Sequence, residues 1–449
     1  MIKKRMALLL CLAILAGLWG CDQFGKGAEG TAEDSGSKTA KLELALFQGG
    51  YGEDYWKSVI EAFQMIHPEV EITYQIHPQI GEMIKPRVLS GDAPDFLYHN
   101  DNKVDGLVQT MIRNHALTDL TDVFEGRAYD REETLRDIIA IPNLLESEKF
   151  SPYQDGKVYL APFNYSPVGL VYDRSLFAEN GWQVPQTWQQ FFALGEEAAA
   201  QGRTLFVYPG VYHGYLEGIF FPAVANAVGL EGLHKMFNYE KGAADNPGVL
   251  QVLEQFSNMS NGMVMQGSRS FNHIRAQGEM MQGNALLVPS GIWIESEMQG
   301  QSHREHVDLD MMAAPALTEG GPRFIQINYE QMMVPRDSKN PELAKEFLRF
   351  LYSDRSVRLF AEKSNGVLAV NDAREMAKSI ISPFVYNLYG ILEEKDVTAF
   401  PVSFDSATGT AEIYDKIFNG CVIPLLEGEI DAQEGARRLE QFFAEMRQK

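Results

Sequence analysis

Cysteine is scarce in this chain, which has three in 449 residues. Cys11 lies within an N-terminal apolar stretch and Cys21 directly follows it, so Cys421 alone remains beyond residue 40. A disulfide framework and a zinc site built on cysteine pairs are therefore excluded for that part of the chain. Cys421 stands between apolar neighbours such as Phe418 and Val422, and we expect it to be a buried packing residue.

Positive charge is also in short supply. The chain has 39 Lys and Arg against 61 Asp and Glu, a formal net charge of −22. Such an acidic surface repels nucleic acid and anionic lipid and favours solubility, so nucleic-acid binding is excluded. The length beyond the N-terminal region is too great for one compact core and is typical of two lobes.

Motifs that would identify an enzyme are missing. Beyond residue 40, the sequence has no G-x-S-x-G elbow, no phosphate-binding G-x-x-x-x-G-K-[ST] loop, no G-x-G-x-x-G turn and no H-E-x-x-H pair. His303 and His306 stand in a polar stretch, which predicts a solvated loop rather than a metal site. Acidic residues are so common that Glu295 and Glu297 do not identify a glycosidase, whose carboxylates are defined by their separation in space. We predict no enzymatic activity, no catalytic residue, no metal and no cofactor.

The N-terminus has the pattern of an export signal. Lys3, Lys4 and Arg5 precede an uncharged apolar run over 6–20, which is shorter than the ~18 residues or more of a membrane-spanning helix. Residues 1–20 are therefore predicted to be a secretory signal peptide. The sequence Leu18-Trp19-Gly20-Cys21 resembles a bacterial lipobox, whose cysteine is acylated, typically with palmitate. An ordinary cleaved signal with an incidental cysteine is the alternative.

Acylation of Cys21 would anchor the mature protein to the outer face of a membrane. Residues 21–40 are rich in Gly, Ala, Ser, Thr and Glu, a composition with little to bury. We expect this segment to be a flexible tether. The predicted location is thus extracytoplasmic, with the protein lipid-anchored to the cell membrane.

From residue 41 onward, strand patterns alternate with helix patterns, which predicts the α/β class with a mainly parallel sheet covered on both faces. Thr187 is an expected helix N-cap. Beyond Val334 helical patterns dominate. The expected strands are 42–46, 70–74, 96–98, 168–172, 205–208, 285–288 and 309–313. The expected helices are 55–66, 80–89, 104–113, 188–200, 215–229, 248–260, 272–282, 341–352, 354–363, 383–394, 410–419 and 431–446.

Several collinear segments between 41 and about 352 resemble the substrate-binding lipoproteins of carbohydrate ABC transporters, the extracellular solute-binding family related to maltose-binding protein. The segments are Tyr55-Trp56 to Val70, the turn Gly91-Asp92-Ala93-Pro94-Asp95, Asp155 to Pro162 with Leu170 to Arg174, Gly181-Trp182 with Pro185-Gln186-Thr187-Trp188, and Gly283-Asn284-Ala285 with Gly291-Ile292-Trp293. Asp173 departs from the family pattern, in which Asn is common. The stretches 208–215 and 265–273, with Ile84 to Arg87, resemble the branch that binds N-acetylglucosamine and its β-linked disaccharide.

The resemblance implies a two-lobe periplasmic-binding-protein-like fold of type II, with a hinge and a ligand cleft between the lobes. Lobe I is expected at 41–165 and 314–368, and lobe II at 166–313 and 369–449. Residues 163–167 are expected to cross between them. The implied function is that of an extracytoplasmic receptor, which captures a mono- or oligosaccharide and delivers it to the permease subunits of an ABC transporter. The receptor is expected to be a monomer.

Sugar recognition requires aromatic faces for C–H groups and polar side chains for hydroxyls, interleaved on loops. Trp293 matches the stacking tryptophan of the family. The alternative for any single Tyr or Trp is a core residue with its polar tip outward. Trp56, Trp182 and Trp188 are expected to be structural. The predicted ligand-binding residues are Tyr51, Tyr98, Asn100, Asp101, Asn164, Tyr165, Tyr212, Tyr215, Trp293, Glu295, Tyr329 and Glu330.

Two functions therefore stay open at the level of sequence. One is the transport receptor, with N-acetylglucosamine or a short β-linked oligosaccharide as the ligand favoured by the resemblance. The other is an envelope carbohydrate-active enzyme, or a sugar sensor without a permease partner. The sequence fixes neither the length of the sugar nor the identity of the permease.

Overall fold

A computed structural model of the chain describes residues 40–100, 106–141, 143–404 and 410–448. The predicted signal peptide, Cys21, the tether up to residue 39 and Asp101 lie outside these residues. The expectations for them are therefore untouched by the structure.

The described strands form one sheet in the order β2-β1-β3-β8-β4-β6-β5, with β7 paired to β4 and β9 paired to β8. This order places β3 directly beside β8, whose paired residues lie more than 230 positions later in the sequence. The strands are β1 (Ala40–Phe47), β2 (Val70–His77), β3 (Phe96–His99), β4 (Ala161–Asp173), β5 (Thr204–Phe206), β6 (Ala285–Gly291), β7 (Leu309–Met312), β8 (Arg323–Met333) and β9 (Val397–Pro401).

The expectation of a mainly parallel sheet is wrong. β1 runs parallel to β2 and β3, β5 to β6, and β8 to β9. The pairings of β3 with β8, and of β4 with β6, β7 and β8, are antiparallel. Strand β8 returns through the middle of the sheet and runs opposite in direction to β3 on one side and β4 on the other.

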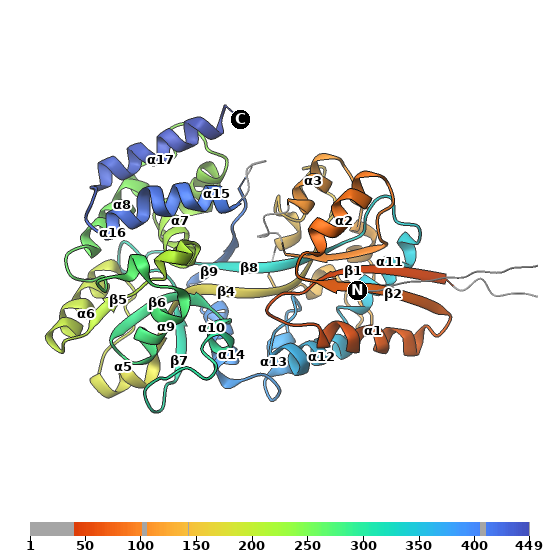
Figure 1. Ribbon diagram of the computed structural model, residues 1–449, viewed down its shortest axis with the longest axis horizontal. Helices are drawn as coiled ribbons and strands as arrows, with labels where there is room; N and C mark the ends of the chain where they lie inside the picture. Colours follow the sequence, from red (N-terminus) through yellow and green to blue (C-terminus); the bar gives the residue numbers. More distant parts are fainter. Residues whose placement is uncertain (1–39, 101–105, 142, 405–409, 449) are drawn as a thin grey trace, which may run out of the picture. The chain divides into compact units, whose positions relative to one another are not determined.

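Strands β4 and β8 are the longest in the sheet and lie side by side (Figure 1). Each contributes to two separate hydrophobic clusters. In β4, Phe163 belongs to the first cluster and Leu170 to the second; in β8, Ile327 belongs to the first and Phe324 to the second. Val171 and Ile325, which directly follow Leu170 and Phe324 in the chain, belong to the first cluster, so the two clusters lie on opposite faces of the sheet there.

Helices cover the sheet, and most of them match the expected ranges to within a few residues. Thr187 caps its helix as expected. Its hydroxyl oxygen accepts from the backbone N–H of Gln190, and the side-chain oxygen of Gln190 accepts from the backbone N–H of Thr187. The helices are α1 (Asp54–Ile66), α2 (Ile80–Leu89), α3 (Leu107–Arg113), α4 (Thr121–Glu125), α5 (Arg174–Asn180), α6 (Trp188–Ala200), α7 (Glu217–Phe237), α8 (Pro247–Met259), α9 (His273–Met281), α10 (Ile294–Glu297), α11 (Pro341–Phe350), α12 (Asp354–Ser364), α13 (Ala373–Ala377), α14 (Pro383–Leu388), α15 (Thr410–Tyr414), α16 (Ile423–Leu426) and α17 (Ala432–Met446).

The α7 region is the most apolar helix among the described residues. The stretch Gly210–Phe237 is long and apolar enough to cross a membrane, but 67% of its most apolar window is buried inside the protein. Gly229, with φ near 70°, interrupts the helix where the sequence pattern predicted its end. The stretch is therefore a core helix, with Phe220 and Phe221 fully enclosed.

The predicted structural residues are confirmed. Trp56, Trp182 and Trp188 are buried, and Cys421 is fully buried next to the backbone of Gly435. Burial raises the pKa of the Cys421 thiol to about 12, which makes it an inert packing residue.

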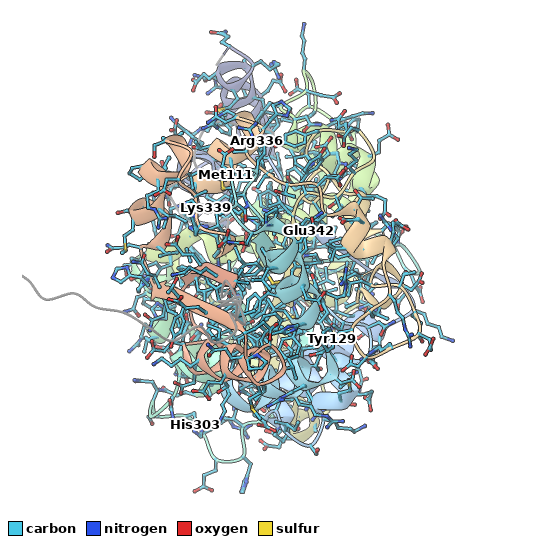
Figure 2. The ribbon with its side chains drawn as sticks, turned by 90° about the vertical axis from the view of Figure 1, so that its right-hand side faces the viewer. Met111, Tyr129, His303, Arg336, Lys339 and Glu342 are labelled. Carbon is cyan, nitrogen blue, oxygen red and sulfur yellow. The ribbon has the colours of Figure 1, made fainter. Side chains whose placement is uncertain are left out.

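Asp95, the last residue of the turn Gly91–Asp95, ties three segments together. One carboxylate oxygen accepts from the backbone N–H of Glu43, at 2.9 Å. The other accepts from the Ser338 hydroxyl and from the backbone N–H groups of Lys339 and Asn340, at 2.8–2.9 Å. Lys339 lies in the connection between β8 and α11, and Glu342 lies in the first turn of α11; both are labelled in Figure 2. An acidic residue is needed here because only a carboxylate accepts from so many donors.

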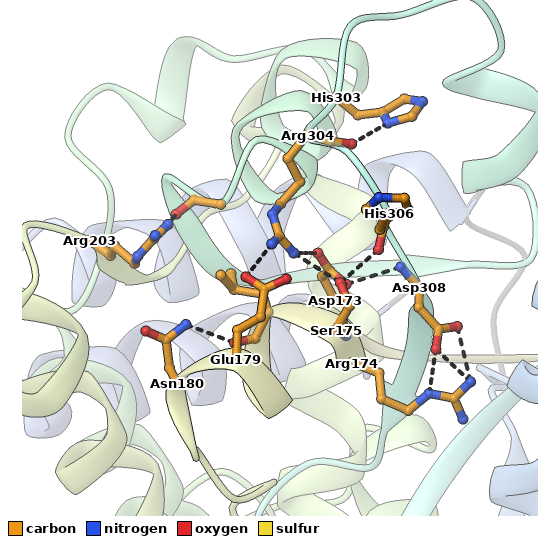
Figure 3. A network of polar contacts seen from close by, with 12 residues as sticks. Asp173, Arg174, Ser175, Glu179, Asn180, Arg203, His303, Arg304, His306 and Asp308 are labelled. Carbon is orange, nitrogen blue, oxygen red and sulfur yellow. Dashed lines mark hydrogen bonds and ion pairs between the residues drawn. The ribbon is translucent and has the colours of Figure 1, made fainter.

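Asp173 has a similar role at the end of β4 (Figure 3). Its fully buried side chain accepts from the backbone and hydroxyl of Ser175, from the backbone of Asp308 and from the Arg304 guanidinium at 2.5 Å. Arg304 also pairs with Glu179. A carboxylate instead of the amide common in the family thus gives Arg304 an ionic partner, and it fixes the loop that carries the exposed His303 and His306.

Candidate ligand-binding cavity

A cavity of about 280 Å³ opens beside the middle of β4 and β8. Its walls come from the loop after β1, the loop after β3, the two central strands, the turn after β6, and the ends of α12 and α14. The lining residues are Gly50, Tyr51, Asn100, Asn164, Ser166, Ile292, Trp293, Glu295, Ser296, Asn328, Tyr329, Glu330, Ser364, Asn365 and Val385. Amide, hydroxyl and carboxylate groups alternate there with two tyrosine rings and an indole.

Glu330 is the most constrained polar group of this cavity. Its carboxylate accepts from the Tyr98 hydroxyl, from the Asn100 amide at 3.0 Å and from the Asn164 amide at 3.2 Å. The Asn164 carbonyl in turn accepts from the Glu330 backbone at 3.0 Å. Burial raises the pKa of Glu330, while these three donors act in the opposite direction. The network holds one acceptor and two amides at fixed positions on the cavity wall.

Trp293 stands half-buried in the turn between β6 and α10. Its ring lies edge-on to Tyr215, with centroids 6.0 Å apart. The ring also packs directly over Gly291, where an added Cβ would come within 2.4 Å of the indole. Glycine at 291 is therefore needed to let the ring lie flat along the end of the strand.

A second cavity of about 480 Å³ adjoins the first, since Trp293 and Asn328 line both. Its other lining residues are Val211, Tyr212, His213, Gly214, Tyr215, Glu217, Glu297 and Tyr414. The half-exposed ring of Tyr212 lies at this cavity, which is aromatic on several sides. Two neighbouring compartments, one mainly polar and one mainly aromatic, thus share the indole of Trp293.

Both carboxylates of the second cavity accept hydrogen bonds. Glu297 accepts from the Tyr215 hydroxyl and from the Gln277 amide, each at 2.7 Å. Glu217 accepts from the Tyr414 hydroxyl and from the Asn328 amide. Burial raises the pKa of Glu217.

Glu295 joins the turn after β6 to the segment between α12 and α14. Its carboxylate accepts from the Asn365 amide at 2.9 Å and from the Ser382 hydroxyl at 2.7 Å. Asn365 also accepts from the Ser382 backbone at 2.8 Å. The wall of the first cavity is therefore held closed on this side by three polar residues from distant parts of the sequence.

The structure brings most of the predicted site residues together. Tyr51, Asn100, Asn164, Trp293, Glu295, Tyr329 and Glu330 line the first cavity, and Tyr212, Tyr215 and Trp293 line the second. Tyr98 and Tyr165 are buried and line neither cavity. Tyr98 supports Glu330 from behind, and the Tyr165 ring packs against Tyr389. Asp101 lies outside the described residues.

Several lining residues were missed by sequence reasoning. Asn328 directly precedes Tyr329 and Glu330, so the criterion of alternating aromatic and polar residues could have included it. Glu217 follows the aromatic stretch 212–215 by two residues, but it opens an apolar helix and gave no separate signal. Glu297, Asn365 and Tyr414 carry no local pattern that distinguishes them from surface residues.

Comparison with protein families shows which family the chain is related to. The bacterial extracellular solute-binding protein family matches residues 49–357, more than half of the chain. The chain belongs to this family. Members act outside the cytoplasm, and the matched region contains β2 to β8, together with most of the residues that line the first cavity.

Relatives and solved structures agree with this assignment. The diacetylchitobiose binding protein NgcE of Streptomyces coelicolor is 29% identical over 72% of this chain and 68% of its own length. The multiple sugar-binding protein of Streptococcus mutans is 22% identical over 82% of this chain and 85% of its own. The ligand-free structure of RafE from Streptococcus pneumoniae superimposes with a TM-score of 0.71 at 18% identity, covering 92% of this chain and 99% of RafE. The fold is thus the two-lobe α/β fold of type II solute-binding proteins.

Proposed function

We propose that this protein is an extracytoplasmic carbohydrate receptor that delivers its ligand to an ABC transporter permease, and that it is not an enzyme. The observation that carries the proposal is the combination of the Glu330 network with the Trp293 ring in one cavity. Fixed acceptors and amides match the hydroxyls of a sugar, while an indole face matches its C–H groups. Membership of the solute-binding family supports the receptor rather than the hydrolase.

The ligand we propose is N-acetylglucosamine or a short β-linked oligosaccharide of it. Its support is the relative named as a diacetylchitobiose binding protein. The two adjoining cavities have room for more than one pyranose ring, because the second alone has about 480 Å³, within the ordinary range of ligand pockets.

A calorimetric titration tests this function. The mature protein should bind N-acetylglucosamine oligomers more tightly than maltose and should release no reducing ends from chromogenic β-glycosides. Tighter binding of maltose would overturn the choice of ligand but leave the receptor in place. Turnover of a glycoside would favour the envelope enzyme instead.

We further propose that the lobes comprise 41–165 with 314–368 and 166–313 with 369–449, and that they close on the ligand. The support is the similarity in fold to two-lobe solute-binding proteins, in which two bodies close about a hinge. Small-angle scattering with and without a bound sugar checks the closure. An unchanged radius of gyration, with binding confirmed by calorimetry, would contradict it.

Membrane anchoring through Cys21 is the remaining part of the proposal. It is supported by the charged start, the short apolar run and the lipobox-like sequence before Cys21. Cys21→Ala should move the protein from the membrane fraction to the soluble fraction while sugar affinity stays the same. Equal recovery of both forms in the membrane fraction would refute the anchor. We also expect the receptor to be a monomer, and gel filtration would check this.

A further inference from the structure

The second cavity is lined by negative charge. Glu217 and Glu297 line it, and neither lysine nor arginine lines this cavity or the first one among the described residues. His213 is the basic side chain in the wall, and burial lowers the pKa of its imidazole, which favours the neutral form. A bound group in this cavity therefore faces carboxylates without an opposing lining cation.

Aromatic rings surround the same space. Tyr212, Tyr215 and Tyr414 line the cavity together with the indole of Trp293. Ring faces attract cations through their quadrupole, and cages of aromatic and acidic side chains are the usual receptors for ammonium groups. The rings thus supply an argument for a cationic group that is independent of the two carboxylates.

Glu297 has acceptor capacity left for such a group. Each of its oxygens accepts one hydrogen bond, from the Tyr215 hydroxyl and from the Gln277 amide, at 2.7 Å. A carboxylate provides about four acceptor positions, so further donors can approach both oxygens. The two existing donors also fix the carboxylate in place, which reduces the entropy lost when a ligand binds.

We propose that the second cavity binds a sugar unit with a free amino group, held as an ammonium between Glu297, Glu217 and the tyrosine rings. The proposal rests on the carbohydrate-receptor function above and specifies its ligand class. Because Trp293 and Asn328 line both cavities, the first cavity adjoins this one and has space for a neighbouring neutral sugar unit of the same oligomer. The ligand class is thus a β-linked oligomer of 2-amino-2-deoxyglucose with at least one amine not acetylated.

Calorimetry with two disaccharides tests the proposal, using chitobiose with free amines and N,N′-diacetylchitobiose at low ionic strength and at a pH where the amines are protonated. Wild type should bind the free-amine disaccharide about tenfold more tightly, since charge-assisted hydrogen bonds contribute roughly 1.5–3 kcal/mol and ~1.4 kcal/mol is a factor of ten. Added salt should reduce this preference. Glu297→Gln should abolish it.

The matched control is Glu254→Gln, which removes the same charge from the exposed side of α8 and should keep the preference. If Glu297→Gln folds poorly, Glu217→Gln should weaken the same preference. Tighter binding of the diacetylated form by wild type, or a preference unaffected by either cavity variant, overturns the amine site while leaving the receptor intact. Binding of choline as tight as that of the free-amine disaccharide also overturns it. Failure of both sugars to bind overturns the receptor and the amine site together.

Discussion

Replacing Trp293 by alanine separates a binding role from a core role. The indole lines both cavities, so its loss removes a contact face worth on the order of 1.5–3 kcal/mol of binding free energy. Sugar affinity should fall by roughly tenfold to a hundredfold or more, since ~1.4 kcal/mol is a factor of ten. The free energy of unfolding should fall by only about 1–2 kcal/mol, because the ring is half-buried and loses chiefly its contact with Tyr215.

Trp182→Ala is the matched control. Trp182 is 6% exposed, contacts Phe177 and lines neither cavity, so its truncation should cost the roughly 3–5 kcal/mol of a core tryptophan and leave the affinity of the folded protein unchanged. Calorimetry measures the sugar affinity of each of the two variants, and urea unfolding measures the free energy of unfolding of each. A Trp293→Ala protein with full affinity and a stability loss as large as that of Trp182→Ala would refute the placement of Trp293 in the site.

Three further substitutions probe other parts of the structure. Asp95→Ala should lower the free energy of unfolding by roughly 1.5–3 kcal/mol in urea, because three partly buried backbone N–H groups lose a charged acceptor; a loss below 1 kcal/mol would contradict the role of Asp95 in joining these segments. Asp173→Asn should cost about 1–3 kcal/mol by removing the ionic partner of Arg304, with calorimetric sugar affinity unchanged; reduced affinity would show that the network reaches the site. Glu330→Gln should weaken the pH dependence of the free energy of unfolding. Because burial raises the pKa of Glu330, the folded state keeps the proton to higher pH than the unfolded chain, so its contribution to stability falls as pH rises from about 4.5 to the raised value. Urea unfolding across that range should show a steeper decline for wild type than for Glu330→Gln, and equal slopes would refute the raised pKa.

Local pattern was sufficient for elements with regularly spaced apolar residues. The helix α1 and the strand β1 were predicted to within two residues, because the apolar residues of α1 share one buried face and the alternating leucines of β1 are all buried. The end of the helical pattern at Gly229 was predicted as well. These features depend on neighbours in the sequence and need no information from distant segments.

Strand β8 was missed because its partners are distant. It carries Gln326, Asn328, Glu330 and Gln331, all of them buried or half-buried, so its pattern lacks the apolar run of a central strand. The groups that satisfy Glu330 come from β4 and from the end of β3, more than 160 residues away. Its antiparallel course between those strands then accounts for the failure to predict a mixed sheet.

The candidate site was predicted best where aromatic and polar residues alternate within a few positions. Trp293 with Glu295, and Tyr329 with Glu330, were found in this way. The same criterion could not separate Tyr98 from the lining residues. A tyrosine whose hydroxyl holds another side chain in place has the same sequence pattern as a tyrosine whose ring lines the cavity. Asn365 and Ser382 form a wall only because folding brings them to Glu295.

The most direct test of the central claim is a calorimetric titration of the mature wild-type protein with N,N′-diacetylchitobiose, its free-amine counterpart and maltose. A receptor built on these two cavities should bind at least one β-linked amino-sugar disaccharide saturably, with one molecule per chain, and more tightly than it binds maltose. The absence of saturable binding to any of the three sugars by a protein that unfolds cooperatively would contradict the account.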